Sequence, residues 1–260
     1  MLIIGEKLSI IARRVREAMN AREAGPIQEI AKAQAEAGAG MIDANIGPAE
    51  DGGEELMQWM VRTIQEAVEL PVCLDTTNQG AIEAGLKVHN NDYGTAMINS
   101  TSNDPERFGM LELAAKYNCR IIGLTVGKGG LPADEEERAA IAAEIMARAM
   151  EYGLGLENIY LDPLVLQIAT TQEQAIKVIR AVRMFQELND PPMNTVVGLS
   201  NISNGCPKHV RPILDRYLLA LLMYEGLTAA IADPKEVVET VKTMEVLMGK
   251  TLYAHSYLEM

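Results

Sequence analysis

Aromatic residues and cysteines are scarce in this chain of 260 residues. Aromatic residues make up 4% of the composition while hydrophobic residues reach 48%, so the core must be built mainly from Ala, Ile, Leu, Val and Met. Such a core is typical of parallel strands covered by helices. The cysteines Cys73, Cys119 and Cys206 lie far apart without paired spacing, which argues against a disulfide framework and predicts three reduced thiols.

Long apolar runs and an excess of positive charge are also missing. No apolar run reaches the roughly 18 residues of a membrane span. Gly5-Glu6-Lys7 interrupts the N-terminal apolar run too early for a span or a cleavable signal. The formal net charge of −13 argues against a polyanionic partner, because nucleic-acid binding depends on clustered Lys and Arg. We therefore expect a cytoplasmic protein with neither a membrane nor a nucleic-acid partner.

Short apolar runs alternate with long amphipathic ones about eight times along the chain. This alternation indicates βαβ units and a parallel sheet. About eight units in 260 residues favour an α/β fold with one closed (β/α)8 TIM barrel as a single domain, residues 1–260. The alternative is an open doubly wound sheet, which usually has fewer units and a glycine-rich turn after its first strand. The predicted strands are Leu2–Glu6, Met41–Ile46, Val72–Asp75, Ala96–Asn99, Arg120–Thr125, Ile159–Asp162, Thr195–Ser200 and Ala229–Asp233.

Helix starts can also be predicted from capping residues. Asp233 precedes Pro234, which suits the first helical position, and Glu236 follows three residues after Asp233 as in a capping box. The same spacing occurs at two other predicted helix starts, Asp134 with Glu137 and Thr171 with Gln174.

Polar residues end nearly every predicted strand, and in a barrel these ends surround one mouth. Any one of them could simply cap the next helix, and Asp233 fits that interpretation. Capping explains Asp75 less well, because three polar residues follow it, and Asp162, because Pro163 and a loop of about eight residues follow it. The strand-end residues are Glu6, Asn45, Asp75, Asn99 with Ser100, Thr125, Asp162, Ser200 with Asn201, and Asp233.

Such a rim suits a flat polar heterocycle. A carboxylate accepts two parallel N–H bonds, so it matches a cyclic amidine or guanidine edge. The 2-amino-4-oxo ring of a pterin presents that edge, and amide side chains can satisfy its other polar atoms. A sugar or a nucleobase could use the same groups.

Several common active-site motifs are absent from the sequence. Gly127-Lys128-Gly129-Gly130 lacks the spacing of a P-loop, and Ser200 does not lie in a Gly-x-Ser-x-Gly elbow. Cys206 and His209 are three residues apart but have no further Cys or His nearby, so no metal site is expected. Two basic clusters suit either a solvated helix face or an anionic ligand tail: Arg13, Arg14 and Arg16, and Lys208, His209, Arg211 and Arg216.

Six segments in the same order along nearly the whole chain resemble the pterin-binding barrels. Within that group the chain is most similar to the methyltetrahydrofolate:corrinoid protein methyltransferases. The segments are Gly5-Glu6, Asp43-Ala44-Asn45-Ile46-Gly47-Pro48, Cys73-Leu74-Asp75-Thr76-Thr77-Asn78, Ala96-Met97-Ile98-Asn99-Ser100-Thr101, Tyr160-Leu161-Asp162-Pro163-Leu164 and Gly198-Leu199-Ser200-Asn201-Ile202-Ser203.

The resemblance implies a role for each of these residues. Asn201 would approach N5 of the folate, the atom that carries the methyl group, as the catalytic residue. Asn204 would also bind the substrate: it stands where acetogenic members carry a Gln that contacts the pterin, and it is shorter by one methylene. The loop 205–210 looks longer than in the family, which affects the role of Arg211. The other substrate-binding residues would be Asp75, Asn99 and Asp162 around the pterin ring, Gly198 and Ser200 on its floor, and Asp43 in support behind them.

The resemblance also implies substrates and partners. The methyl group would pass between tetrahydrofolate and the cobalt of a corrinoid (cobalamin) held by a separate protein, in the one-carbon metabolism of an anaerobe. A homodimer is expected from the family, and the barrel needs no metal of its own. Dihydropteroate synthase is one alternative, but that family has a basic anion site after its last strand, where this chain reads Ala229-Ala230-Ile231-Ala232-Asp233. The other alternative is a folate-binding subunit without turnover.

Overall fold

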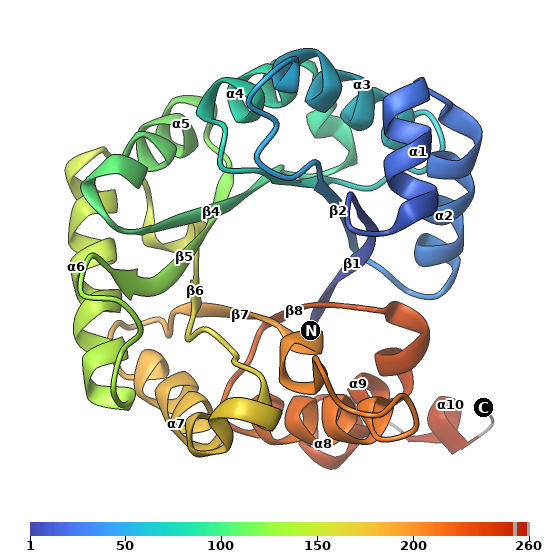
Figure 1. Ribbon diagram of the computed structural model, residues 1–260. Helices are drawn as coiled ribbons and strands as arrows, with labels where there is room; N and C mark the ends of the chain where they lie inside the picture. Colours follow the sequence, from blue (N-terminus) through green and yellow to red (C-terminus); the bar gives the residue numbers. More distant parts are fainter. Residues whose placement is uncertain (252–253, 259–260) are drawn as a thin grey trace.

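Eight parallel strands form a closed barrel in the computed structural model, which describes residues 1–251 and 254–258. Each strand pairs with the next in chain order, and β1 closes the ring against β8 (Figure 1). The predicted (β/α)8 barrel is therefore confirmed, and the open sheet is ruled out. The last residues of the expected domain, 259–260, lie outside the described part. The strands are β1 Leu2–Ser9, β2 Met41–Asn45, β3 Val72–Asp75, β4 Met97–Asn103, β5 Arg120–Gly127, β6 Ile159–Asp162, β7 Asn194–Gly198 and β8 Ala229–Ala232.

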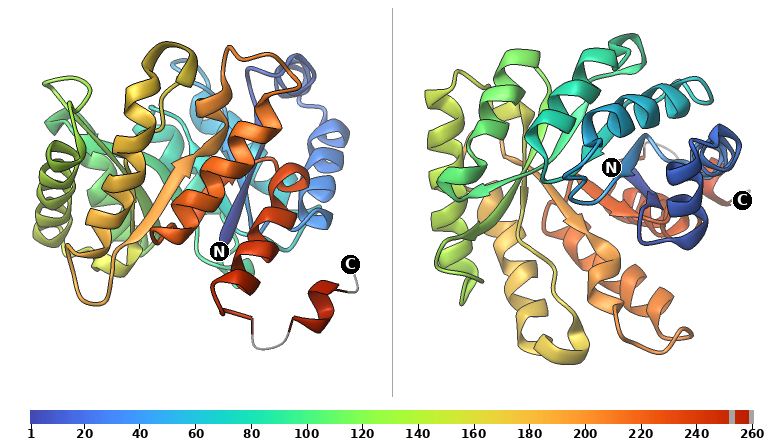
Figure 2. Two further views of the ribbon diagram at one scale, coloured as in Figure 1. Left: turned by 90° about the horizontal axis from the view of Figure 1, so that it is seen from below. Right: turned by 45° about the horizontal axis from the view of Figure 1, so that its top comes forward.

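Helices cover the outside of the barrel (Figure 2). Within the described residues, none of them combines the length and apolar character needed to cross a membrane. Short 3-10 turns include η2 Pro105–Arg107 and η4 Leu199–Ser203. The helices are α1 Arg13–Ala21, α2 Ala24–Glu36, α3 Gly53–Gln65, α4 Gln79–Val88, α5 Gly109–Tyr117, α6 Glu135–Glu151, α7 Ile168–Gln186, α8 Arg211–Tyr224, α9 Pro234–Leu247 and α10 His255–Leu258.

The barrel interior is filled by buried side chains, one from each strand, so it is a packed floor rather than a pore. Cys73 belongs to this layer, and none of the three cysteines is paired, as predicted. A larger apolar layer lies between the strands and the helices. The interior residues are Ile4, Met41, Cys73, Met97, Ile122, Tyr160, Val196 and Ala229.

Strand β1 continues to Ser9, beyond the predicted end at Glu6, because a bulge follows Gly5. The Lys7 N–H donates to the side-chain oxygen of Gln34 on α2 (2.9 Å). A Cβ on Gly5 would lie 2.5 Å from the same oxygen, so glycine is what lets α2 dock against the bulge. Strands β4 and β5 also run past their predicted ends. Strand β7, by contrast, stops at Gly198, and the predicted last two residues belong to η4.

Two predicted helix caps are confirmed. Asp134 accepts a bond from the Glu137 N–H (2.9 Å), and the Glu137 carboxylate reaches back to the Ala133 N–H (2.7 Å). Asp233 caps α9 by accepting from the Lys235 N–H (3.1 Å). Asp233 is therefore a structural cap, as its sequence context indicates.

Two other predicted capping bonds do not form. Glu236 accepts a bond from Arg216 (3.2 Å) on α8 instead of reaching back to its own helix start. Helix α7 begins at Ile168 and is divided by the non-helical Thr171 (φ −139°, ψ 49°), so a helical segment does start after Thr171, but the Thr171 hydroxyl donates back to the Gln167 carbonyl (2.8 Å). Gln174 is engaged by a side chain of α6 instead, so contacts between helices override the local pattern.

Candidate active site

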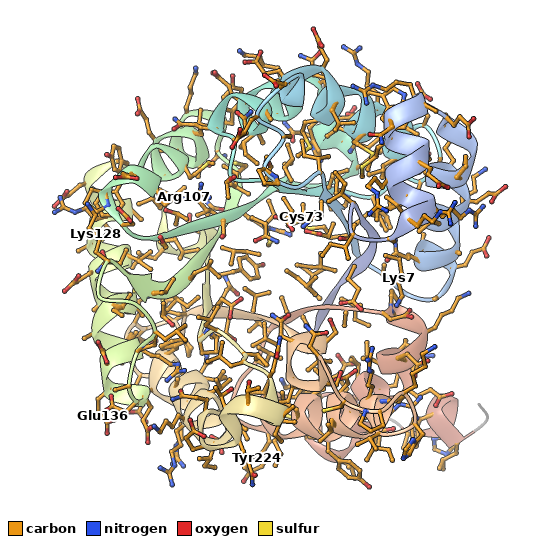
Figure 3. All side chains as sticks on the ribbon, viewed as in Figure 1. Lys7, Cys73, Arg107, Lys128, Glu136 and Tyr224 are labelled. Carbon is orange, nitrogen blue, oxygen red and sulfur yellow. The ribbon has the colours of Figure 1, made fainter. Side chains whose placement is uncertain are left out.

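The carboxyl ends of the strands meet at one mouth of the barrel. In the register of neighbouring strands, Asn45 of β2 pairs with Asp75 of β3, which in turn pairs with Asn99 of β4. Asp162 ends β6 on the far side of the ring (Figure 1). In Figure 3 Cys73 lies within the ring of strands, where it belongs to the buried interior layer.

Two carboxyl groups with raised pKa values lie side by side on β2 and β3. Asp43 is 3% exposed and accepts a bond from the Asn99 amide (3.4 Å), while the Asn45 amide donates to Asp75. Burial, followed by the charge of Asp75, raises the pKa of Asp43 well above its usual range. Burial also raises the pKa of Asp75 to about 6, against the bond from Asn45. Of the two, Asp75 is the carboxyl group at the end of its strand, and its pKa lies below neutral pH.

Asp162 is buried, and its carboxylate accepts a bond from the Leu164 N–H (2.7 Å). Its main-chain carbonyl accepts a bond from the Thr125 hydroxyl (2.9 Å), which ties β6 to β5. Burial raises the pKa of Asp162 to about 7, and the Leu164 N–H and the charge of Arg138 oppose that rise. At neutral pH the Asp162 carboxyl group therefore populates both its protonated and its ionised form.

The turn after β7 presents an amide to the mouth. A Cβ on Gly198 would lie 2.9 Å from Nδ2 of Asn201, so the bare glycine provides the space for that amide. The Asn204 amide donates to Oδ1 of Asn201 at 3.5 Å, a long contact between exposed groups. The Ser200 hydroxyl donates to Glu6 on β1 (2.9 Å), which links the turn after β7 to β1 across the end of β8.

The sequence model of the family described as "Pterin binding enzyme" matches residues 13–232. The chain belongs to the pterin-binding enzyme family. It is 27% identical over 262 aligned residues to a methylcorrinoid:tetrahydrofolate methyltransferase of Eubacterium limosum, covering 99% of this chain and 94% of that protein. The resemblance found in the sequence is therefore confirmed, and the chain is a full-length homologue of that methyltransferase.

One further relative and one solved structure are similar to this chain. A methionine synthase of Mycobacterium leprae is 29% identical over 249 residues, which cover 91% of this chain but 20% of that much longer protein. The structure of Xanthomonas albilineans dihydropteroate synthase with 4-aminobenzoic acid superposes with a TM-score of 0.69 over 95% of this chain and 92% of that one. At 16% identity the second likeness shows the shared barrel alone.

Arg107 is a rim residue of this pterin-binding enzyme that the sequence did not single out. Its guanidinium donates to the main-chain oxygens of Ser100 (2.7 Å) and Thr77 (3.0 Å), and so joins the loops after β3 and β4. In Figure 3 it lies beside β4, while Lys7 lies beside β1. Arg107 follows Asn99 by eight residues inside a short turn, and no local pattern marks such a position.

The two basic clusters differ in their surroundings. Arg13 pairs with Glu17 (2.7 Å) and Arg14 pairs with Glu29, both on the exposed outer helices. Arg16 donates only to main-chain oxygens. These contacts favour a solvated helix face over a ligand contact.

The second cluster lies beside the mouth. Lys208 and Arg211 line a cavity of about 320 Å³ together with Ser200 and Asn204. Arg211 is exposed, and it donates through Nε to the main-chain oxygen of Cys206 (2.8 Å). Among the described residues, no group of three or more His, Cys, Asp and Glu side chains could hold a metal ion.

Proposed function

We propose that this enzyme moves a methyl group between N5 of tetrahydrofolate and the cobalt of a corrinoid carried by a separate protein. The observation that carries the proposal is the arrangement of Asp75, Asn99 and Asp162 around one barrel mouth, beside the Asn201 amide. The full-length similarity to a methylcorrinoid:tetrahydrofolate methyltransferase supports the same substrates.

The mouth matches the donors and acceptors of a pterin ring. The 2-amino group and the neighbouring ring N–H form two parallel donors, and ionised Asp162 can accept both. Across the mouth, ionised Asp75 accepts from the ring's other N–H groups, and the Asn99 amide serves the remaining polar atoms. Gly198 and Ser200 form part of the floor, and Asp43 supports Asn99 by accepting a bond from its amide.

Methyl transfer requires the bond between N5 and the methyl carbon to break with its electron pair left on nitrogen. The reduced cobalt of the partner supplies the pair that forms the new cobalt–carbon bond, and N5 takes up a proton from water. Asn201 stabilises the transition state by donating its amide N–H to N5 as negative charge develops there. Neither a metal ligand nor a charged acid is needed beside N5 for this step.

The direct test mixes the enzyme with methyltetrahydrofolate and chemically reduced free cobalamin, and follows the visible spectrum of the cobalt. We expect the spectrum of reduced cobalamin to be replaced by that of methylcobalamin. Absence of that change, with folate binding intact, would favour a binding subunit without turnover. Condensation of a pterin diphosphate with 4-aminobenzoate would instead indicate a dihydropteroate synthase.

Gly198→Ala is expected to lower kcat about tenfold, because the added Cβ would displace the Asn201 amide that now lies 2.9 Å from that position. Gly129→Ala is the matched control, since a Cβ there meets nothing within 4 Å. Both variants are measured by the cobalamin assay. If the Gly198→Ala enzyme were as fast as the Gly129→Ala enzyme, the close contact between Gly198 and the Asn201 amide would have no role in catalysis.

We further propose that the protein is a homodimer that pairs through α8. Ile213, Tyr217, Leu221 and Tyr224 form an exposed apolar stripe on α8, opposite its buried face, and both tyrosines are 72% exposed. An unpaired apolar stripe of this kind is typical of an interaction surface. Antiparallel pairing about a two-fold axis would bring Arg211, at the start of α8, toward Glu225 of the partner subunit, so the charges at the two ends are complementary.

Tyr217→Glu is expected to convert the dimer to a monomer, because a charge would be buried at the centre of the stripe. Light scattering after size-exclusion chromatography measures the mass. Tyr152→Glu, an exposed tyrosine at the end of α6, should leave the dimer intact. A wild-type protein that elutes as a monomer at all concentrations would disprove the pairing.

A further inference from the structure

Arg138 on α6 is a fully buried arginine, with a side chain that is 0% exposed. Its guanidinium donates to the Pro163 carbonyl (2.7 Å), to the Asp134 carbonyl (3.0 Å) and to the side-chain oxygen of Gln174 (2.9 Å). All three acceptors are neutral. Burial lowers the pKa of Arg138, but an arginine remains charged throughout the neutral range. A buried charge without an ion pair is costly, so its retention calls for a reason.

The contact with Pro163 places Arg138 against the loop that carries Asp162. Pro163 directly follows Asp162, and the next residue, Leu164, donates its N–H to the Asp162 carboxylate (2.7 Å). The guanidinium therefore holds the Pro163 carbonyl, whose carbon is bonded directly to the Leu164 nitrogen. Any movement of that carbonyl would move the Leu164 N–H away from the carboxylate.

The same arginine acts on the charge of Asp162. Burial raises the pKa of Asp162 to about 7, and among the described residues Arg138 is the cation that lowers it. The other charged groups that act on Arg138 are Asp134, Glu135 and Glu137, all in or next to the first turn of α6. Neutral side chains reach this region from β5 (Thr125) and α7 (Gln174). Two cations of α7 also reach it: Lys177 donates to the Ala133 carbonyl (2.7 Å), and Arg180 pairs with Glu135 (3.1 Å).

We propose that Arg138 is a positioning residue of the pterin site, which fixes the loop after β6 and holds Asp162 in the ionised form that accepts the two N–H bonds of the pterin edge. The inference rests on the proposed binding role of Asp162. In the low-dielectric interior a single cation acts strongly on a neighbouring carboxyl group without touching it. The positive charge of Arg138 therefore stabilises the ionised form of Asp162, although no carboxylate pairs with it directly.

The test compares the affinity for methyltetrahydrofolate at pH 6 and pH 8.5 in wild type and Arg138→Met, by calorimetry. Removing the positive charge raises the pKa of Asp162, so binding should weaken most where Asp162 is already partly protonated. A rise of one pKa unit would weaken binding about ninefold at pH 6 but less than about 1.5-fold at pH 8.5. Titration of Asp75 contributes equally in both proteins and cancels in the comparison.

Two variants separate charge from packing. Arg138→Lys keeps the positive charge but loses the planar guanidinium. The ratio of the affinity at pH 8.5 to the affinity at pH 6 should therefore return toward the wild-type value. Gln174→Leu removes one hydrogen bond without changing any charge, so it should lower Tm and leave the ratio unchanged. If Arg138→Met does not fold, Arg138→Gln repeats the test, because its amide can still donate to a main-chain carbonyl.

Each outcome has a distinct meaning. An equal loss of affinity at both pH values in the neutral variants would overturn the proposal and reduce Arg138 to a packing residue. An Arg138→Lys enzyme with the same ratio as Arg138→Met would overturn it too. Failure of the wild type to bind methyltetrahydrofolate would instead contradict the proposed function.

Discussion

Replacing Asn201 with alanine is expected to slow methyl transfer about 100-fold, the usual effect of removing one donor that stabilises charge in a transition state. The affinity for methyltetrahydrofolate should fall less than about threefold, because the carboxylates hold the ring independently of this amide. Single-turnover kinetics with reduced cobalamin measure the rate, and calorimetry measures the dissociation constant. The rate and the affinity must therefore respond very differently to this one change.

Asn194→Ala is the matched control for this prediction. Asn194 begins β7, at the opposite end of that strand from Asn201, and its amide donates to the Glu157 carbonyl (2.9 Å). Its removal should change the rate by less than about threefold, since it does not touch the reacting atoms. If the Asn201→Ala enzyme transferred methyl groups at the wild-type rate, Asn201 would have no catalytic role.

Asp162→Asn is expected to weaken the binding of methyltetrahydrofolate about 10- to 100-fold, with the deficit visible by calorimetry at pH 8. Hydrogen bonds to a charged acceptor contribute about 1.5–3 kcal/mol, and the amide would turn an NH2 donor toward the donors of the ring. Asp92→Asn is the control: Asp92 is exposed and precedes β4, at the end of the strands opposite the mouth, and its replacement should leave the affinity within about twofold.

The pH dependence gives this prediction a second readout. Wild-type affinity should fall as the pH drops through about 7, because Asp162 becomes protonated there. In Asp162→Asn that step should vanish, leaving only the step near pH 6 that belongs to Asp75. An affinity and pH profile equal to those of the wild type would place Asp162 outside the site.

The stability of Asp162→Asn shows whether a loss of affinity reflects the site or the fold. The pKa of Asp162 is higher in the folded protein than in the unfolded chain, so the ionised carboxylate opposes folding above that pKa. At pH 8 the asparagine variant should therefore have a Tm at or above that of the wild type. A large drop in Tm would attribute the lost affinity to misfolding.

The barrel could be predicted from the sequence because its strands are short apolar runs between long amphipathic ones. The bounds of β3 and β6 agree with the prediction to the residue. The end of β1 could not be predicted, since the bulge after Gly5 depends on Gln34, which lies 29 residues away on α2. The end of β7 was predicted wrongly for a related reason. Leu199 and Ser200 favour an extended chain locally, but they fold into η4.

The candidate site could be predicted in part. Asp75, Asn99 and Asp162 end strands, and the closure of a parallel barrel places all strand ends at one mouth. Their roles stay predictions. Arg107 and Arg138 could not be found, because one lies in an irregular turn and the other on an outer helix, and only the folded chain brings them to the loops they hold.

A crystal structure of the enzyme with methyltetrahydrofolate tests the central claim most directly. We predict that the pterin ring lies across the barrel mouth, with its amidine edge on Asp162, further contacts to Asp75 and Asn99, and N5 within hydrogen-bonding reach of the Asn201 amide. A ring bound elsewhere, or one with N5 turned away from Asn201, would contradict the account.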